Sequence, residues 1–114
     1  IHGEPGISRE KLKSANDLTD DICNRIFHDF KLGDNDEISL MINSLGATPL
    51  EELYIVSRRV IENINKNKTK IYKNYVGRYA TSMEMAGMSV TVLKLNENIK
   101  KYLVAPSNCP FWTN

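Results

Sequence analysis

The chain has 114 residues, of which 41% are hydrophobic and 25% are charged, a composition typical of one globular domain with a single hydrophobic core. Its formal net charge of +1 gives no electrostatic reason to expect direct binding of nucleic acid or of an anionic membrane. The apolar runs are too short to cross a bilayer and nothing resembles a signal peptide, so we expect a cytoplasmic protein.

The first predicted element is a helix that begins at Asn16, its expected N-cap, and runs to about Phe30. Apolar side chains recur in it every four residues and form one stripe, as in a helix with one buried face. Residues 33–36 (GDND) then form a turn, and the β-prone residues 38–44 (ISLMINS) predict a buried strand.

A second helix is predicted from its start signal, in which Thr48 is the N-cap and Pro49 is the first helical residue. It extends to about residue 65. The roughly alternating residues 70–81 and the Val- and Thr-rich residues 88–95 predict two strands. Because a turn at 82–87 separates them, they are expected to pair with each other as an antiparallel hairpin.

A short third helix is predicted at residues 97–103, capped by Asn96, and an aromatic tail broken by proline follows at 109–112. The predicted order is helix, strand, helix, strand, strand, short helix. This order indicates an α/β, or α+β layered, fold in which helices cover a small mixed sheet.

The opening residues 1–7 (IHGEPGI) contain two glycines and a proline, which predict a stiff, tightly turned loop that presents the imidazole of His2. A neutral imidazole can act as a base, a ligand or a nucleophile, although the spacing alone favours a structural role for His2. The other histidine, His28, lies off the apolar stripe of the first helix and is expected to be a packing or surface residue.

Other candidate groups carry less information about function. Glu84 is a lone acid in a predicted turn, and the loop at 45–49 (LGATP) lacks the full pattern of a phosphate-binding loop. Cys23 and Cys109 lie far apart, have no zinc-ligand spacing, and are expected to be reduced. The residue types and their spacing therefore assign no reaction by themselves.

Three segments in order along the chain resemble the dihydroxyacetone kinase family: 1–7 (IHGEPGI), 44–54 (SLGATPLEELY) and 81–95 (TSMEMAGMSVTVLKL). They are similar to the second half of the substrate-binding K domain of that family. The resemblance implies that residues 1–114 form the second, C-terminal subdomain of the dihydroxyacetone-binding domain, whose N-terminal half is absent from this chain. It also implies a homodimer.

In that family, the histidine at the position of His2 bonds covalently to the ketone carbon of dihydroxyacetone as a hemiaminal. The resemblance thus implies that His2 is catalytic and substrate-binding, with Gly3 beside it as a second substrate-binding residue. Covalent capture would select a short ketose over glycerol and would hold its terminal hydroxyl for phosphoryl transfer. No cofactor or metal is expected on this chain, because nucleotide and Mg would be bound by a partner L subunit or domain.

The resemblance leaves two functions open. The first is the substrate-binding subunit of a multi-subunit dihydroxyacetone kinase whose phosphoryl donor is ATP or a phosphotransferase system. This fragment alone would be inactive. The second is a ligand-sensing co-activator of a transcriptional regulator of the kinase operon, suggested by departures from the family pattern at Ser44, Met88 and Asn96. A third interpretation, from the residues alone, is an interaction domain in which His2 is structural.

Overall fold

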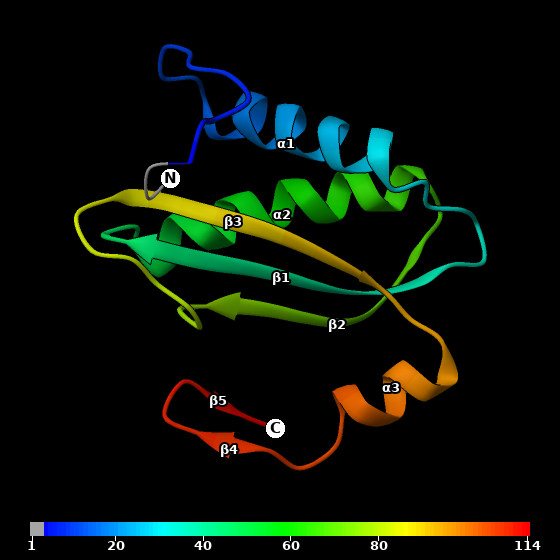
Figure 1. Cartoon of the computed structure of the whole chain (residues 1–114). Coiled ribbons are helices and arrows are strands. Elements are labelled where there is room, and N and C mark those ends of the chain that lie inside the picture. The colour runs from blue at the N-terminus through cyan, green and yellow to red at the C-terminus, as the bar shows by residue number, and fades with distance from the viewer. Residues whose placement is uncertain (1–3) are drawn as a thin grey trace.

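The computed structural model describes residues 4–114, which form three helices and five strands (Figure 1). In chain order these are α1 (Ala15–Asp29), β1 (Glu37–Gly46), α2 (Leu50–Lys66), β2 (Lys70–Gly77), β3 (Ala86–Lys94), α3 (Glu97–Leu103), β4 (Asn108–Cys109) and β5 (Trp112–Thr113). The predicted fold class is confirmed, because helices cover a small mixed sheet.

β1 is the central strand of a three-stranded sheet with the order β2-β1-β3. Ile38, Leu40 and Ile42 are fully buried on one face of β1, and Ser39 and Asn43 are nearly buried on the other. A strand buried on both faces belongs in the interior of a sheet, where neighbours on both sides satisfy its backbone groups.

The pairing of the sheet differs from the sequence prediction. β1 pairs with β2 in parallel and with β3 in antiparallel orientation, and β2 and β3 lie on opposite sides of it. The predicted antiparallel hairpin between residues 70–81 and 88–95 is therefore wrong. The reason is that α2 carries the chain across one face of the sheet from β1 to β2, and residues 78–85 then carry it past the end of β1 to β3 (Figure 1).

α1 and α2 lie on one face of the sheet (Figure 1). α2 packs on β1 and β2, and α1 packs on α2. The core between these layers consists of Cys23 from α1, Ile38, Leu40 and Ile42 from β1, and Leu53, Val56, Val60 and Ile64 from α2. Full burial of each large apolar side chain stabilises the fold by about 1.5–3 kcal/mol relative to exposure.

The starts of α1 and α2 are displaced by two residues and one residue, respectively, from the predictions. The N-cap of α1 is Ser14, whose hydroxyl accepts a hydrogen bond from the Asp17 amide, whereas the side-chain oxygen of Asn16 accepts one from Arg58 of α2. The N-cap of α2 is Pro49, without a side-chain hydrogen bond, and not Thr48. The predicted cap of α3 is confirmed, since the Asn96 side chain accepts a hydrogen bond from the Ile99 amide at 2.9 Å.

The C-terminal part of the chain lies on the side of the sheet away from α1 and α2 (Figure 1). Lys100 of α3 forms an ion pair with Glu37 at the start of β1. At the other end of this tail, the Trp112 ring packs at 4.6 Å from the Tyr75 ring and at 5.3 Å from the Tyr79 ring, both measured between centroids. The tail is thus attached to the sheet at two separate points.

The two cysteines of the chain lie far apart in the fold, in α1 and in β4, and differ in exposure. Cys23 is buried and Cys109 is exposed, and both are free thiols. None of the helices in residues 4–114 combines the length and the hydropathy that a bilayer span requires.

Candidate functional site

Two of the three segments that carry the family resemblance meet at one end of the sheet. The parallel strands β1 and β2 end there and β3 begins there, so the β1–α2 connection lies against the connection of residues 78–85. In α/β sheets, ligands bind outside the carboxyl ends of parallel strands, because the connecting loops there can be varied without disturbing the core. This end of the sheet is therefore the candidate site.

Gly46, the last residue of β1, contacts the second connection directly. Its amide donates a hydrogen bond to the Thr81 hydroxyl at 2.9 Å, and its carbonyl accepts one from the Arg78 guanidinium at 2.7 Å. The next amide, of Ala47, donates to the Met85 carbonyl at 2.8 Å. Gly46 has φ +70°, and a Cβ there would lie 1.9 Å from the Met85 carbonyl oxygen. Only glycine allows this approach.

Asn43, which lies three residues before Gly46 in β1, bonds the same connection. Its side-chain oxygen accepts hydrogen bonds from the amides of Tyr79 and Ala80 at 2.8 and 3.2 Å, and its side-chain nitrogen donates to the Ala80 carbonyl at 2.7 Å. The residue is 5% exposed. Sequence reasoning assigned no role to Asn43, although a polar residue within an apolar strand is a signal that its side chain has a buried partner.

An open hollow of about 690 Å³ lies over the joined connections and is lined by Gly46, Ala47, Arg78, Thr81, Ser82, Glu84, Met85 and Ala86. Its polar side chains all come from the second connection. Glu84 has φ +56°, a left-handed conformation that costs free energy in a residue other than glycine. The turn therefore holds the Glu84 backbone in an unfavourable conformation at the rim of the hollow.

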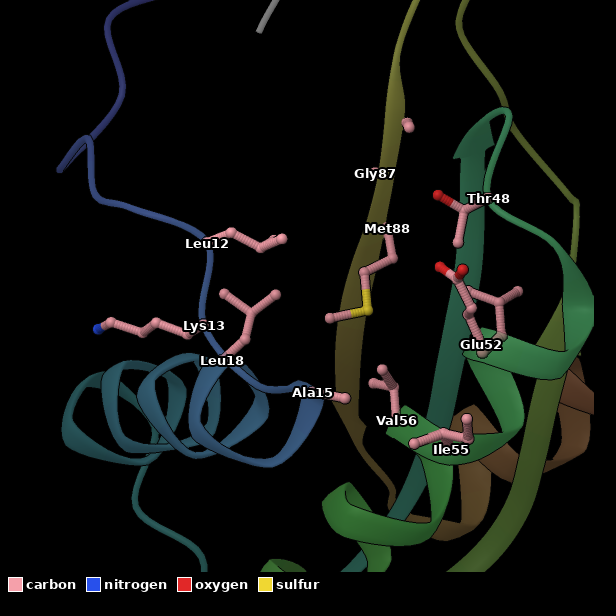
Figure 2. A pocket seen from close by; sticks show the side chains of 12 residues that line it. Leu12, Lys13, Ala15, Leu18, Thr48, Glu52, Ile55, Val56, Gly87 and Met88 are labelled. Carbon is pink, nitrogen blue, oxygen red and sulfur yellow. The ribbon is translucent and has the colours of Figure 1, made fainter.

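A second cavity, of about 270 Å³, is apolar and lies on the helical side of β3 (Figure 2). Leu12 and Leu18 form one wall, and Met88 of β3 lies between them and α2. Thr48 and Glu52 are polar groups on the α2 side of this groove. The groove can take an apolar side chain, and the polar side chains along it are those of Lys13, Thr48 and Glu52.

The site residues predicted from the resemblance, His2 and Gly3, lie outside the described residues. His28 lies near the end of α1 with its side chain 88% exposed, as expected, beside Asp29. In the loop at 45–49, the amides of Gly46 and Ala47 are bonded within the protein, so they are not available to an anion. The part of the chain from residue 4 onward contains no group of three His, Cys, Asp or Glu side chains placed to hold a metal ion.

Comparison with known proteins places these features in a family. The Dak1 domain profile matches residues 1–111, which include all three segments described above. The chain belongs to the Dak1 domain family. Within this family, it is 38% identical over 112 residues to a protein from Listeria innocua described as PTS-dependent dihydroxyacetone kinase 2, dihydroxyacetone-binding subunit DhaK. That match covers 98% of this chain and 34% of the relative.

Two solved structures resemble this Dak1 domain over 93% of its length. One belongs to work on regulation of the DHA operon of Lactococcus lactis, with a TM-score of 0.81 and 29% identity. The other is a dihydroxyacetone kinase operon co-activator, Dha-DhaQ, with a TM-score of 0.80 and 28% identity. Each match covers 34% of the solved chain, so this Dak1 domain spans about a third of the length of the proteins it resembles.

Proposed function

We propose that this chain contributes to a binding site for dihydroxyacetone in which His2 forms a covalent bond to the ketone and Gly3 lies beside it. The observation that carries the proposal is the Dak1 domain match, which includes the His2 segment, together with 38% identity to a dihydroxyacetone-binding subunit. The joined connections at Gly46 support it, because they form a hydrogen-bonded rim at the end of the sheet where α/β folds bind ligands.

The proposed chemistry is a reversible addition. The unprotonated nitrogen of the His2 imidazole attacks the ketone carbon, a C–N bond forms, and the π electrons of the C=O bond move to the oxygen. The oxygen takes up a proton and the other ring nitrogen releases one, so the product is a neutral hemiaminal. Glycerol has no carbonyl and cannot form this bond, so the site would discriminate by reactivity and not by hydrogen bonding alone.

The proposal extends to the organisation of the complete protein. Residues 1–114 would be the C-terminal subdomain of a dihydroxyacetone-binding unit that acts as a homodimer. The captured ketose would present its terminal hydroxyl to a phosphoryl group supplied through a nucleotide-binding L subunit, which would also bind Mg. Support for a multi-subunit system comes from the relative in Listeria innocua, which is described as one subunit of a PTS-dependent kinase.

Calorimetry and intact-mass measurement on the natural full-length polypeptide test the covalent step. We expect saturable binding of dihydroxyacetone with a mass increase of one ligand, and no binding of glycerol. The His2→Ala variant should lose both signals, whereas His28→Ala, which replaces the exposed histidine of α1, should retain them. Unchanged binding by the His2→Ala variant would falsify the proposal.

The second candidate function is that of a non-catalytic co-activator of a transcriptional regulator. It is favoured by the likeness to the Dha-DhaQ co-activator structure, at a TM-score of 0.80. Mixing the full-length protein with a nucleotide-bearing L subunit, a phosphoryl donor (ATP or the phosphotransferase components) and dihydroxyacetone separates the two functions. Formation of dihydroxyacetone phosphate supports the kinase, whereas ketone binding without product, together with ketone-dependent binding to a transcriptional regulator, supports the co-activator.

A further inference from the structure

We infer that Asn43 is a positioning residue that fixes residues 78–85 at the candidate site, and that its side-chain N–H donor is as necessary as its acceptor oxygen. The inference rests on the proposed function for its link to ligand binding. Its structural part, the immobilisation of the connection, depends only on the contacts of Asn43.

The contacts of Asn43 use both ends of its amide. The oxygen accepts from two consecutive backbone amides, those of Tyr79 and Ala80, and the nitrogen donates to the Ala80 carbonyl at 2.7 Å. The nitrogen also lies 3.4 Å from the Ser89 hydroxyl of β3. One side chain of the central strand therefore bonds the backbone of the β2–β3 connection as a neighbouring strand would, while also contacting β3 itself.

The position of Asn43 in the sheet gives these bonds their effect. It lies three residues before Gly46, which bonds the same connection through Arg78 and Thr81. The Asn43 bonds fall between those two residues in the sequence, at positions 79 and 80. Two residues of β1 thus bond four consecutive residues of the connection, 78–81, and leave Ser82 and Glu84 to line the open hollow beyond them.

Burial makes the Asn43 bonds strong determinants of loop position. Asn43 is 5% exposed, so water does not replace a hydrogen-bond partner that its side chain loses. Each buried group left without a partner destabilises the local structure. A residue with only an acceptor, or only a donor, would leave part of the turn at 79–80 unbonded. This requirement distinguishes asparagine from the similarly sized aspartate, whose carboxylate only accepts, and from leucine, which neither donates nor accepts.

The Asn43→Asp variant tests the donor, because its protonation can be controlled by pH. Near pH 8 the carboxylate still accepts from the two amides, but its second oxygen faces the Ala80 carbonyl oxygen and repels it. Near pH 5 a buried carboxyl facing a carbonyl takes up a proton and donates in place of the amide nitrogen. Because the variant is compared with the parent at the same pH, the response belongs to the new carboxyl.

The measurement is amide hydrogen exchange of residues 78–85 in the natural full-length protein, expressed as the ratio of variant to parent at each pH. We expect exchange at least about tenfold faster than in the parent near pH 8, as the loss of one buried hydrogen bond predicts, and a ratio near one at pH 5. Asn74→Asp is the control for the same substitution at an exposed position of β2, because Asn74 donates to the Ser57 hydroxyl at 3.3 Å and not to the connection. Its ratio for residues 78–85 should stay near one at both values.

Each outcome decides the inference. A ratio near one at pH 8, or an equally raised ratio at both pH values, overturns it. A variant that unfolds at pH 8 and refolds at pH 5 with parent-like protection supports it, whereas one that is unfolded at both values contradicts it.

Dihydroxyacetone affinity, measured by calorimetry on the same proteins, tests the link to function. Near pH 8, we expect Asn43→Asp to bind dihydroxyacetone at least about tenfold more weakly than the parent does. Asn74→Asp should bind it with the affinity of the parent. Faster loop exchange with unchanged affinity would mean that Asn43 is structural and positions nothing for the ligand. Absence of ketone binding by the parent itself would contradict the proposed function, and the exchange ratios would still decide whether Asn43 fixes the connection.

Discussion

Arg59 of α2 bonds Asp20 of α1 through two nitrogens, with N–O distances of 2.6 and 2.8 Å. Asn63, one turn further along α2, donates to the same carboxylate at 2.7 Å. These bonds stabilise the ionised form of Asp20 and lower its pKa to about 2. They are the polar part of the α1–α2 contact, at the edge of the apolar core.

This contact predicts a pH dependence of stability. The pKa of Asp20 is lower in the folded chain than in the unfolded chain, so its contribution is present above the unfolded value of about 4 and is lost as the pH falls toward 2. In the Asp20→Asn variant, we expect a lower urea midpoint at pH 7 and a shallower decline of that midpoint between pH 4 and 2. Asp29→Asn is the control, because Asp29 is exposed beside His28, and its midpoints should follow the parent.

Gly46 provides a prediction about the backbone at the candidate site. Gly46→Ala forces a side chain into a left-handed conformation and places its Cβ against the Met85 carbonyl. We expect the free energy of unfolding to fall by at least about 1–2 kcal/mol, measured by urea denaturation, with faster amide exchange in residues 78–85. Gly33→Ala serves as the control, since a Cβ there meets its nearest neighbour, Asp36, at an ordinary 3.6 Å. Equal losses in the two variants would contradict the assignment of strain to Gly46.

The pattern of buried residues in the strands was predictable, but the partner of each strand was not. Residues 38–44 are β-prone and mostly apolar, and β1 contains all of them. The prediction paired residues 70–81 with 88–95 because they are neighbours in the sequence. In the observed arrangement both strands lie beside β1. This strand thereby gains backbone hydrogen bonds on both edges, and the α2 crossover covers its apolar face.

The local chemistry of the candidate site was harder to predict than its location. The segments at 44–54 and 81–95 were identified from the resemblance, and the structure brings them together through Gly46, Ala47 and Met85. The role of Asn43 depends on backbone groups 36 and 37 residues later in the chain, a distance that no local pattern spans. β4 and β5 were missed because each is two residues long and has no periodicity to detect.

Leu40 of β1 lies in the hydrophobic core, and truncating its side chain tests how that core is packed. It is fully buried between the helices and the sheet, so Leu40→Ala should lower the free energy of unfolding by about 2–5 kcal/mol. Leu12, which is 99% exposed, is the matched control, and Leu12→Ala should change that free energy by less than about 0.5 kcal/mol. Urea denaturation monitored by circular dichroism measures both. Similar small effects at the two positions would argue against burial of β1 between the layers.

Tyr75 of β2 contributes to the attachment of the C-terminal tail through its ring, whereas its hydroxyl opposes folding. This hydroxyl is buried and has no hydrogen-bond partner within residues 4–114, while its ring packs against Trp112. Burial also raises the pKa of the phenol. Because an unsatisfied buried hydroxyl opposes folding, Tyr75→Phe should raise the free energy of unfolding by about 1 kcal/mol, whereas Tyr75→Ala, which removes the ring, should lower it.

Trp112 is the single tryptophan of the chain, so its emission reports the packing of the tail directly. Tyr75→Phe should leave the emission maximum unchanged, and Tyr75→Ala should shift it to longer wavelength as the indole becomes solvated. Tyr72→Phe is the control, since Tyr72 is 39% exposed and its hydroxyl can be hydrated, so both stability and emission should match the parent. A loss of stability in Tyr75→Phe would mean that the hydroxyl has a bonding partner, such as an ordered water, and that this partner helps to hold the tail on the sheet.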